Sequence, residues 1–236
     1  MPSALRFEPC AGPVWRCTEA QFRSATVRIT DTNAEQALLE DILEDTKPPM
    51  TPACRHLHYA FAAAFRYGAY PRDSRFRRRG RTPGVYYASE HMLSAISETI
   101  WYRWAFFAAS PETPLPRQPV EHTGICADIS VAAGHDLTQD ADPRWTDPDD
   151  YSACLARADQ VRAQGGGLIR YASVRDPDAR ANVAVLTCAG FAETRPNGLQ
   201  GWKILFTATT ARAFCDTTRE NYEMHRSGTR LAWGLG

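Results

Sequence analysis

Arginines gather in one short stretch of the sequence, RDSRFRRRGRTPG, at residues 72 to 84. Six of them lie within ten positions: Arg72, Arg75, Arg77, Arg78, Arg79 and Arg81. A guanidinium presents its N–H donors in a planar fork that can hold two oxygens of a phosphate at once. The stretch could therefore face a nucleic-acid backbone, a small phosphorylated ligand, or only water and the chain's own acids.

The charge balance of the chain argues against a nucleic-acid partner. Its 27 Lys and Arg residues equal its 27 Asp and Glu residues, and the pI is near 7, whereas domains that bind nucleic acid are commonly strongly basic. An aspartate-rich segment, DLTQDADPRWTDPDD at 136 to 150, offsets the arginine stretch, and its turn-forming residues predict a surface loop. Direct nucleic-acid binding is therefore not expected, although a basic-patch binding module stays open as an alternative.

A glutamate in the next predicted helix, Glu98, is a second candidate for chemistry. The helix has an apolar stripe, and Glu98 lies roughly 160° from the centre of that stripe. The face around Glu98 is small and aromatic, and Tyr102 stands at the i+4 position where a basic partner would be expected. This pattern leaves two interpretations open, a solvent-facing glutamate and a carboxylate that lines a cleft.

The elements that must position these residues follow from the apolar periodicity. Helices are expected at residues 34–45, at 56–65, at 90–109 with Ser89 as the N-cap, and at about 151–164. Strands are expected at 85–88, 124–131, 167–174, 182–188 and 202–209. Helices early and strands late in one chain predict an α+β fold, with residues 1–236 as a single domain.

Other features indicate the compartment. The seven cysteines are scattered and contain no CxxC motif, which predicts free thiols in a reducing cytoplasm. No secretory signal is visible, and no apolar stretch approaches the roughly 20 residues that span a bilayer.

His56 and His58 would diverge by about 200° on the predicted helix, so no metal site is expected.

Three blocks, which together span residues about 74 to 186, carry a resemblance to a known family. They are SRFRRRGRTPGVYYAS (74–89), AISE (95–98) and LIRYASVRDPDARANVAVL (168–186). The sequence resembles the RES-domain family of bacterial toxins that consume NAD. The opening VWRCTEAQF (14–22) is similar to that family's N-terminal Tyr/Trp-Arg element. The resemblance implies a mixed or antiparallel β core with surrounding helices, similar to ADP-ribosyltransferases.

The resemblance also implies roles for individual residues. Arg75 matches the family arginine, Glu98 the glutamate, Ser173 the serine and Tyr87 the pocket tyrosine. The spacing between the arginine and the tyrosine differs from that of shorter members, so Arg77 stays open as an alternative to Arg75. Ala172 stands where the family usually has proline, which leaves the backbone before the serine less constrained.

The implied activity is cleavage of the nicotinamide–ribose bond of NAD⁺. ADP-ribose would pass to phosphate, as in an NAD⁺ phosphorylase, or to water, as in a glycohydrolase, with transfer to a protein as the variant. NAD⁺ is then a substrate, inorganic phosphate a co-substrate in the first case, and no cofactor is expected. The implied partner is an antitoxin protein with a DNA-binding domain. Glu98 would stabilise the oxocarbenium-like transition state, Arg75 would hold the pyrophosphate, and Tyr87 and Ser173 would contact the nicotinamide riboside.

Overall fold

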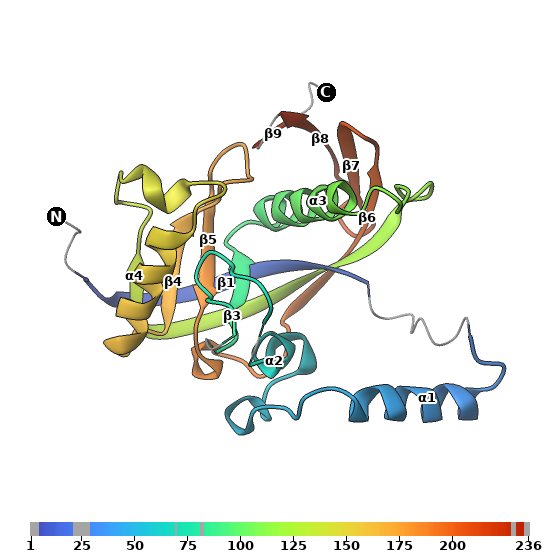
Figure 1. The fold of residues 1–236 in the computed structure, drawn as a ribbon, viewed down its shortest axis with the longest axis horizontal. Helices are drawn as coiled ribbons and strands as arrows, with labels where there is room; N and C mark the ends of the chain where they lie inside the picture. The colour runs from blue at the N-terminus through green and yellow to red at the C-terminus, as the bar shows by residue number, and fades with distance from the viewer. Residues whose placement is uncertain (1–4, 21–28, 69, 81–82, 228–229, 234–236) are drawn as a thin grey trace.

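A mixed sheet of nine strands organises the chain in the computed structural model, which describes residues 5–20, 29–68, 70–80, 83–227 and 230–233 (Figure 1). The strand order is β1-β2-β5-β4-β3-β6-β7-β8-β9. The strands are β1 Glu8–Glu19, β2 Tyr86–Ser89, β3 Val120–Asp136, β4 Leu168–Ala172, β5 Ala181–Val185, β6 Gly198–Phe206, β7 Thr210–Cys215, β8 Asn221–Ser227 and β9 Arg230–Trp233. Together with the helices they confirm the predicted α+β class.

The long strand β3 connects the two halves of this sheet. Its last residues run parallel to β4, and its first residues pair antiparallel with β6. It also pairs with β1 along most of its length, so the pairings β1–β2–β5–β4–β3–β1 close into a ring. From β6 the chain continues as an antiparallel meander through β7, β8 and β9. β1 and the meander strands β7–β9 are not among the strands expected from the sequence.

The four predicted helices are present among the described residues, with shifted starts. They are α1 Asn33–Asp45, α2 Tyr59–Arg66, α3 Met92–Ala109 and α4 Ser152–Ala163. The predicted N-cap of α3 is wrong, because Ser89 ends β2 and its hydroxyl donates to Asn182 Oδ1 at 2.6 Å, so His91 precedes the helix instead. In α2 the helix begins after His58, whose ring accepts from the backbone N–H of Ala60.

Helix α1 forms where the sequence predicts it but does not bury its apolar stripe. Thr32 and Glu35 make a reciprocal capping box at its start, which explains a stable helix end from local residues alone. Leu38 is 61% exposed, and Ile42 and Leu43 are also exposed. Figure 1 shows α1 at the edge of the molecule, away from the sheet.

Three apolar clusters hold the other helices on the sheet. In the first, Phe61 of α2 packs near Tyr86 and Ile129; in the second, Val161 of α4 packs near Ile169 and Leu186. In the third, α3 packs against the meander through Ile96, Ile100, Trp104, Trp202, Ile204 and Met224. Ile96 and Ile100 lie in this third cluster, which fixes the rotation of α3 about its own axis. Glu98 therefore projects from a different face of the helix.

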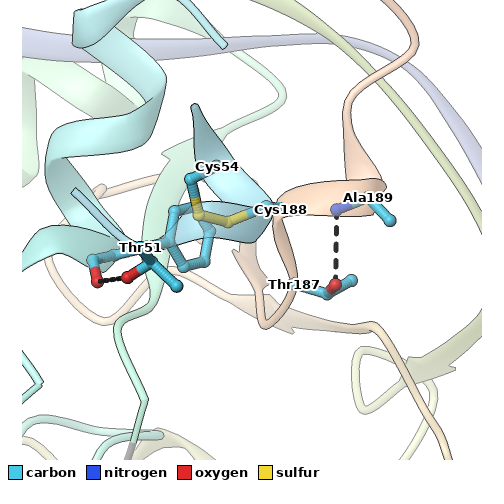
Figure 2. Close-up of a disulfide and its surroundings, with 6 residues drawn as sticks. Thr51, Cys54, Thr187, Cys188 and Ala189 are labelled. Carbon is cyan, nitrogen blue, oxygen red and sulfur yellow. Dashed lines mark hydrogen bonds between the residues drawn. A yellow bond between two sulfur atoms is a disulfide. The ribbon is translucent and has the colours of Figure 1, made fainter. Parts of the chain in front are cut away.

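A disulfide joins Cys54 and Cys188, as Figure 2 shows, so the expectation that all cysteines are free is wrong in this structure. Cys54 ends a short 3₁₀ turn before α2, and Cys188 begins another after β5. The two residues are 134 positions apart, and packing of the α2 region on β5 brings their Cα atoms to 5.3 Å. No local spacing could reveal such a pair. The other five cysteines are free.

Within the described residues, none of the helices has the length and apolar character needed to cross a membrane.

Candidate active site

Glu98 lies at the centre of a hydrogen-bonded cluster on α3. Its Oε1 accepts from Ser173 Oγ at 2.7 Å and from Asn182 Nδ2 at 2.8 Å. The side chains of Ser173 and Asn182 are almost completely buried, whereas Glu98 is partly exposed. Both hydrogen bonds reach the same carboxylate oxygen, and no described residue is found to donate to Oε2. Two side chains of the protein thus hold the carboxylate through one of its oxygens.

The sheet positions both donors. Asn182 on β5 lies opposite Tyr171 of β4 and opposite Ser89 of β2, so it occupies the middle of three adjacent strands. The Ser89 hydroxyl donates to Oδ1 of Asn182, which orients the amide so that its NH₂ group points at Glu98. Because buried polar groups must be satisfied, this chain of bonds fixes the rotamers of all three residues.

Ser173 stands in a turn directly after β4. Its Oγ accepts the backbone N–H groups of Asp176 at 3.0 Å and Arg175 at 3.3 Å while donating its own proton to Glu98. Asp176 is buried as well, where it pairs with Arg180 and accepts from Ser94 of α3. The turn is therefore tied to α3 at two points, one of which is Glu98.

The environment of Glu98 disfavours its charged form. Burial raises the pKa of the carboxyl above its ordinary value, while the hydrogen bonds from Ser173 and Asn182 and the guanidiniums of Arg175 and Arg75 partly oppose this shift. A carboxylate that is poorly hydrated and held in one rotamer interacts strongly with a nearby positive charge. Burial, together with the same carboxylate, also raises the pKa of neighbouring Tyr171.

Arg75 is buried beside this cluster, but its guanidinium is held by backbone. Its Nη1 donates to the carbonyl of Trp145 at 2.9 Å and its Nη2 to that of Asp147 at 2.8 Å, while the guanidinium lies over the ring of Tyr151. The arginine thus contacts the aspartate-rich segment through carbonyls, not carboxylates. Its charge still reaches Glu98, where it lowers the pKa of the carboxyl.

Tyr87 holds the segment that carries Arg75. Its hydroxyl lies 2.9 Å from Ser74 Oγ and accepts the backbone N–H of Phe76 at 3.0 Å, so it contacts both neighbours of Arg75 in sequence. Arg162 of α4 donates to the carbonyl of Phe76 from the other side. In this structure the tyrosine hydroxyl positions the arginine segment.

Arg77 points elsewhere. It donates to the carbonyl of Tyr67, and its guanidinium lies over the ring of Tyr70. In the rest of the stretch, Arg78 pairs with Asp159 at 2.8 Å, and Arg81 lies outside the described residues. The geometry therefore brings Arg75, and not Arg77, to the Glu98 cluster.

Two residues of this cluster are not among the candidates from the sequence. Asn182 is the second residue of the buried strand β5, and a polar residue at the start of an apolar strand was the available signal. Arg175 is buried two residues after Ser173; its guanidinium stacks on Trp101 at 4.1 Å, and its Nη2 donates to the carbonyl of Pro148 at 2.9 Å. Trp101 lies one turn after Glu98 on α3. The described residues contain no group of three or more His, Cys, Asp or Glu side chains placed to hold a metal ion.

The comparison with known proteins agrees with the motifs. A search of the curated proteins finds no sequence match. The family described as RES domain matches residues 50–207, which contain Arg75, Tyr87, Glu98, Ser173 and Asn182. The match covers more than half of the chain, from the turn before α2 to the end of β6. The chain therefore belongs to the RES-domain family.

Proposed function

We propose that the protein is an enzyme that cleaves the nicotinamide–ribose bond of NAD⁺ and passes ADP-ribose to phosphate or to water. The observation that carries this proposal is the Glu98 carboxylate, which is partly desolvated and held through one oxygen by Ser173 and Asn182. Membership of the RES-domain family, which is consistent with a toxin-type function related to NAD, supports the same chemistry.

The carboxylate would act on charge that develops during bond breaking. As the bond from ribose C1 to the nicotinamide nitrogen lengthens, positive charge grows on the ribose, and nicotinamide leaves as a neutral base. At about 4 Å and an effective dielectric near 20, a unit charge pair is worth roughly 4 kcal/mol, or on the order of a thousandfold in rate. The carboxylate must be ionised to do this, and the hydrogen bonds that lower its pKa favour that state.

The other residues would bind and orient the substrate. Arg75 supplies positive charge for the pyrophosphate, either directly, by exchanging a backbone carbonyl for a phosphate oxygen, or by holding the 145–147 segment. Tyr87 would keep the Arg75 segment in place. Ser173 would orient Glu98 and, in the bound state, could contact the ribose.

The acceptor decides the class of enzyme. Attack of phosphate on ribose C1 gives ADP-ribose 1″-phosphate and nicotinamide, whereas attack of water gives ADP-ribose, nicotinamide and a proton. The purified protein is incubated with NAD⁺ with and without phosphate, nicotinamide release is followed by chromatography, and the products are identified by ³¹P NMR. Faster release with phosphate and a sugar-phosphate product support the phosphorylase. Folded protein that consumes no NAD⁺ under either condition would overturn the proposal.

A protein partner that restrains this activity is part of the same proposal. A toxin that depletes NAD⁺ in the cell that makes it requires an inhibitor, and an antitoxin with a DNA-binding domain fits that need. Co-expression with a neighbouring gene product that abolishes NAD⁺ consumption would support it; a purified pair with undiminished turnover would contradict it.

A further inference from the structure

Strand β8 contacts α3. It follows, in the sequence, the residues that match the family. The match ends at residue 207, so β7, β8 and β9 belong to the part of the chain that follows it. Figure 1 shows β8 and β9 on the α3 side of the molecule, above the helix in this view. Buried Met224 of β8 contacts Ser97 Oγ of α3 through its sulfur at 3.7 Å.

Arg226 follows on the same face of β8, because side chains two residues apart project to the same side of a strand. Its guanidinium lies 5.9 Å from the ring centre of Trp101, one helical turn after Ser97. The residue is exposed, and no carboxylate of the described chain is found in an ion pair with it. Its charge is therefore directed at the Trp101 side of α3 and open to an anion.

Trp101 brings this charge together with a second one. The guanidinium of Arg175 lies 4.1 Å from the centre of the same ring, and its charge already lowers the pKa of Glu98. Trp101 follows Glu98 by three residues, about 4.5 Å along the helix axis. Both guanidiniums therefore contact the same indole beside the Glu98 carboxylate, and a guanidinium is a suitable group to bind a phosphate oxyanion.

The end of the C-terminal meander is also attached to the turn that carries Ser173. Trp233 Nε1 donates to Asp178 Oδ2 at 3.1 Å, and the guanidinium of Arg180 lies 5.7 Å from the ring centre of Trp233. The meander thus contacts α3, which carries Glu98, and the 173–180 turn, which carries Ser173. These contacts of the meander position Arg226.

We infer that Arg226, together with Arg175 and Trp101, forms a phosphate-binding subsite of the Glu98 site, and that the C-terminal strands supply one of its two charges. This inference rests on the proposed function and deepens it. The phosphate group could be the pyrophosphate of NAD⁺ or the inorganic phosphate acceptor. The shared chemistry is a tetrahedral oxyanion held by two guanidiniums.

The test is Arg226→Ala, with Arg226→Lys as a conservative variant. Arg212→Ala is the matched control, because Arg212 is an exposed arginine on the neighbouring strand β7. KM is measured separately for NAD⁺ and for phosphate. Loss of one charge-assisted contact is expected to raise one KM on the order of tenfold in Arg226→Ala, less in Arg226→Lys and not in Arg212→Ala.

The changes in the two KM values identify which phosphate group binds at the subsite. A higher KM for phosphate alone assigns the subsite to the acceptor, and a higher KM for NAD⁺ with and without phosphate assigns it to the pyrophosphate. Both values unchanged in folded Arg226→Ala, or equal effects in Arg212→Ala, would overturn the inference while the proposed function stands.

Calorimetric binding of inorganic pyrophosphate, inorganic phosphate and ADP-ribose to the wild type and to Arg226→Ala gives a readout without turnover. Weaker binding of at least one probe by Arg226→Ala supports the subsite even if the wild type consumes no NAD⁺. Equal binding of all three by both proteins would count against it independently of the kinetics.

Discussion

Glu98 is held by two neutral donors, and the nearby cations do not pair with it directly. Ser173 and Asn182 fix Oε1, whereas Arg75 and Arg175 donate to carbonyls of the 145–148 segment. A direct ion pair would neutralise the carboxylate before a substrate arrives, and breaking it would cost energy. Neutral donors orient the group and leave its charge for the positive centre that forms during the reaction.

The first prediction concerns that charge. Glu98→Gln keeps an oxygen to accept from Ser173 and Asn182 but removes the negative charge, so turnover of NAD⁺ is expected to fall at least a hundredfold. Nicotinamide release under saturating NAD⁺ measures it, with Glu112→Gln as the exposed control. Undiminished turnover in Glu98→Gln would remove Glu98 from the mechanism.

The same substitution should raise the stability of the folded protein relative to the wild type at high pH, although it lowers turnover. The folded-state pKa of Glu98 is raised, so the folded state binds its proton more tightly than the unfolded chain does. The wild type therefore loses stability relative to Glu98→Gln as pH rises from the ordinary glutamate range through the raised pKa. Urea unfolding of both proteins at pH 4.5 and pH 8 measures this, since about 1.4 kcal/mol corresponds to each pK unit. A difference in unfolding free energy that is the same at both pH values would contradict it.

A third prediction follows from the hydrogen bond of Ser173, which lowers the pKa of Glu98. Without the hydroxyl, the pKa of Glu98 rises further, so the acid limb of the pH–rate profile moves to higher pH in Ser173→Ala. Ser152→Ala, which removes an exposed hydroxyl bonded to Asp150, should leave the limb in place. An unshifted limb with reduced turnover would mean that Ser173 acts on the substrate and not through Glu98.

At the scale of elements, helices could be predicted well and the meander poorly. α1 has apolar residues at helical spacing, and a local capping box marks its start. β7–β9 pair with their neighbours in sequence, but their short, charged sequences, such as NYEMHRS, give little alternation to detect. The family motifs predict Arg75, Glu98 and Ser173 as a set, but the sequence alone could not show that Asn182 completes the contact to Glu98 from a paired strand.

Gly84 shows how tightly the elements around the arginine segment pack. A Cβ at this position would meet the backbone of α2, at 2.5 Å from Phe65 Cα and also too close to the carbonyl oxygen of Ala64. Gly84→Ala is therefore expected to cost about 1–3 kcal/mol of unfolding free energy. Gly68→Ala is the control, since its Cβ would meet nothing within 4 Å, and it should change stability by less than about 0.5 kcal/mol. Equal effects in denaturant unfolding would show that α2 is not packed against Gly84 in this way.

At the scale of the whole molecule, the candidate site draws on distant parts of the chain. α3 supplies Glu98, the turn after β4 supplies Ser173 and β5 supplies Asn182, and the C-terminal meander contacts α3 and that turn. The disulfide joins Cys54, just before α2, to Cys188, which follows β5, the strand that carries Asn182. Each of these connections joins residues far apart in sequence, which is why the spacing of motifs could identify candidates but not their contacts.

The last prediction tests the disulfide. Denatured protein kept free of reductant should titrate five thiols, and seven after reduction. Because the bridge closes a loop of 134 positions, its loss should lower the unfolding free energy by about 2–5 kcal/mol. The double variant Cys54→Ala/Cys188→Ala should match the reduced wild type, and Cys10→Ala, which removes a free thiol, should keep the full response to reductant. The hydrogen-bond donors to Glu98 are Ser173 and Asn182 and not the bridged cysteines, so turnover per folded molecule should be unchanged. Seven thiols without reductant would instead support the reducing cytoplasm that the scattered cysteines predict, with Cys54 and Cys188 packed as neighbouring thiols.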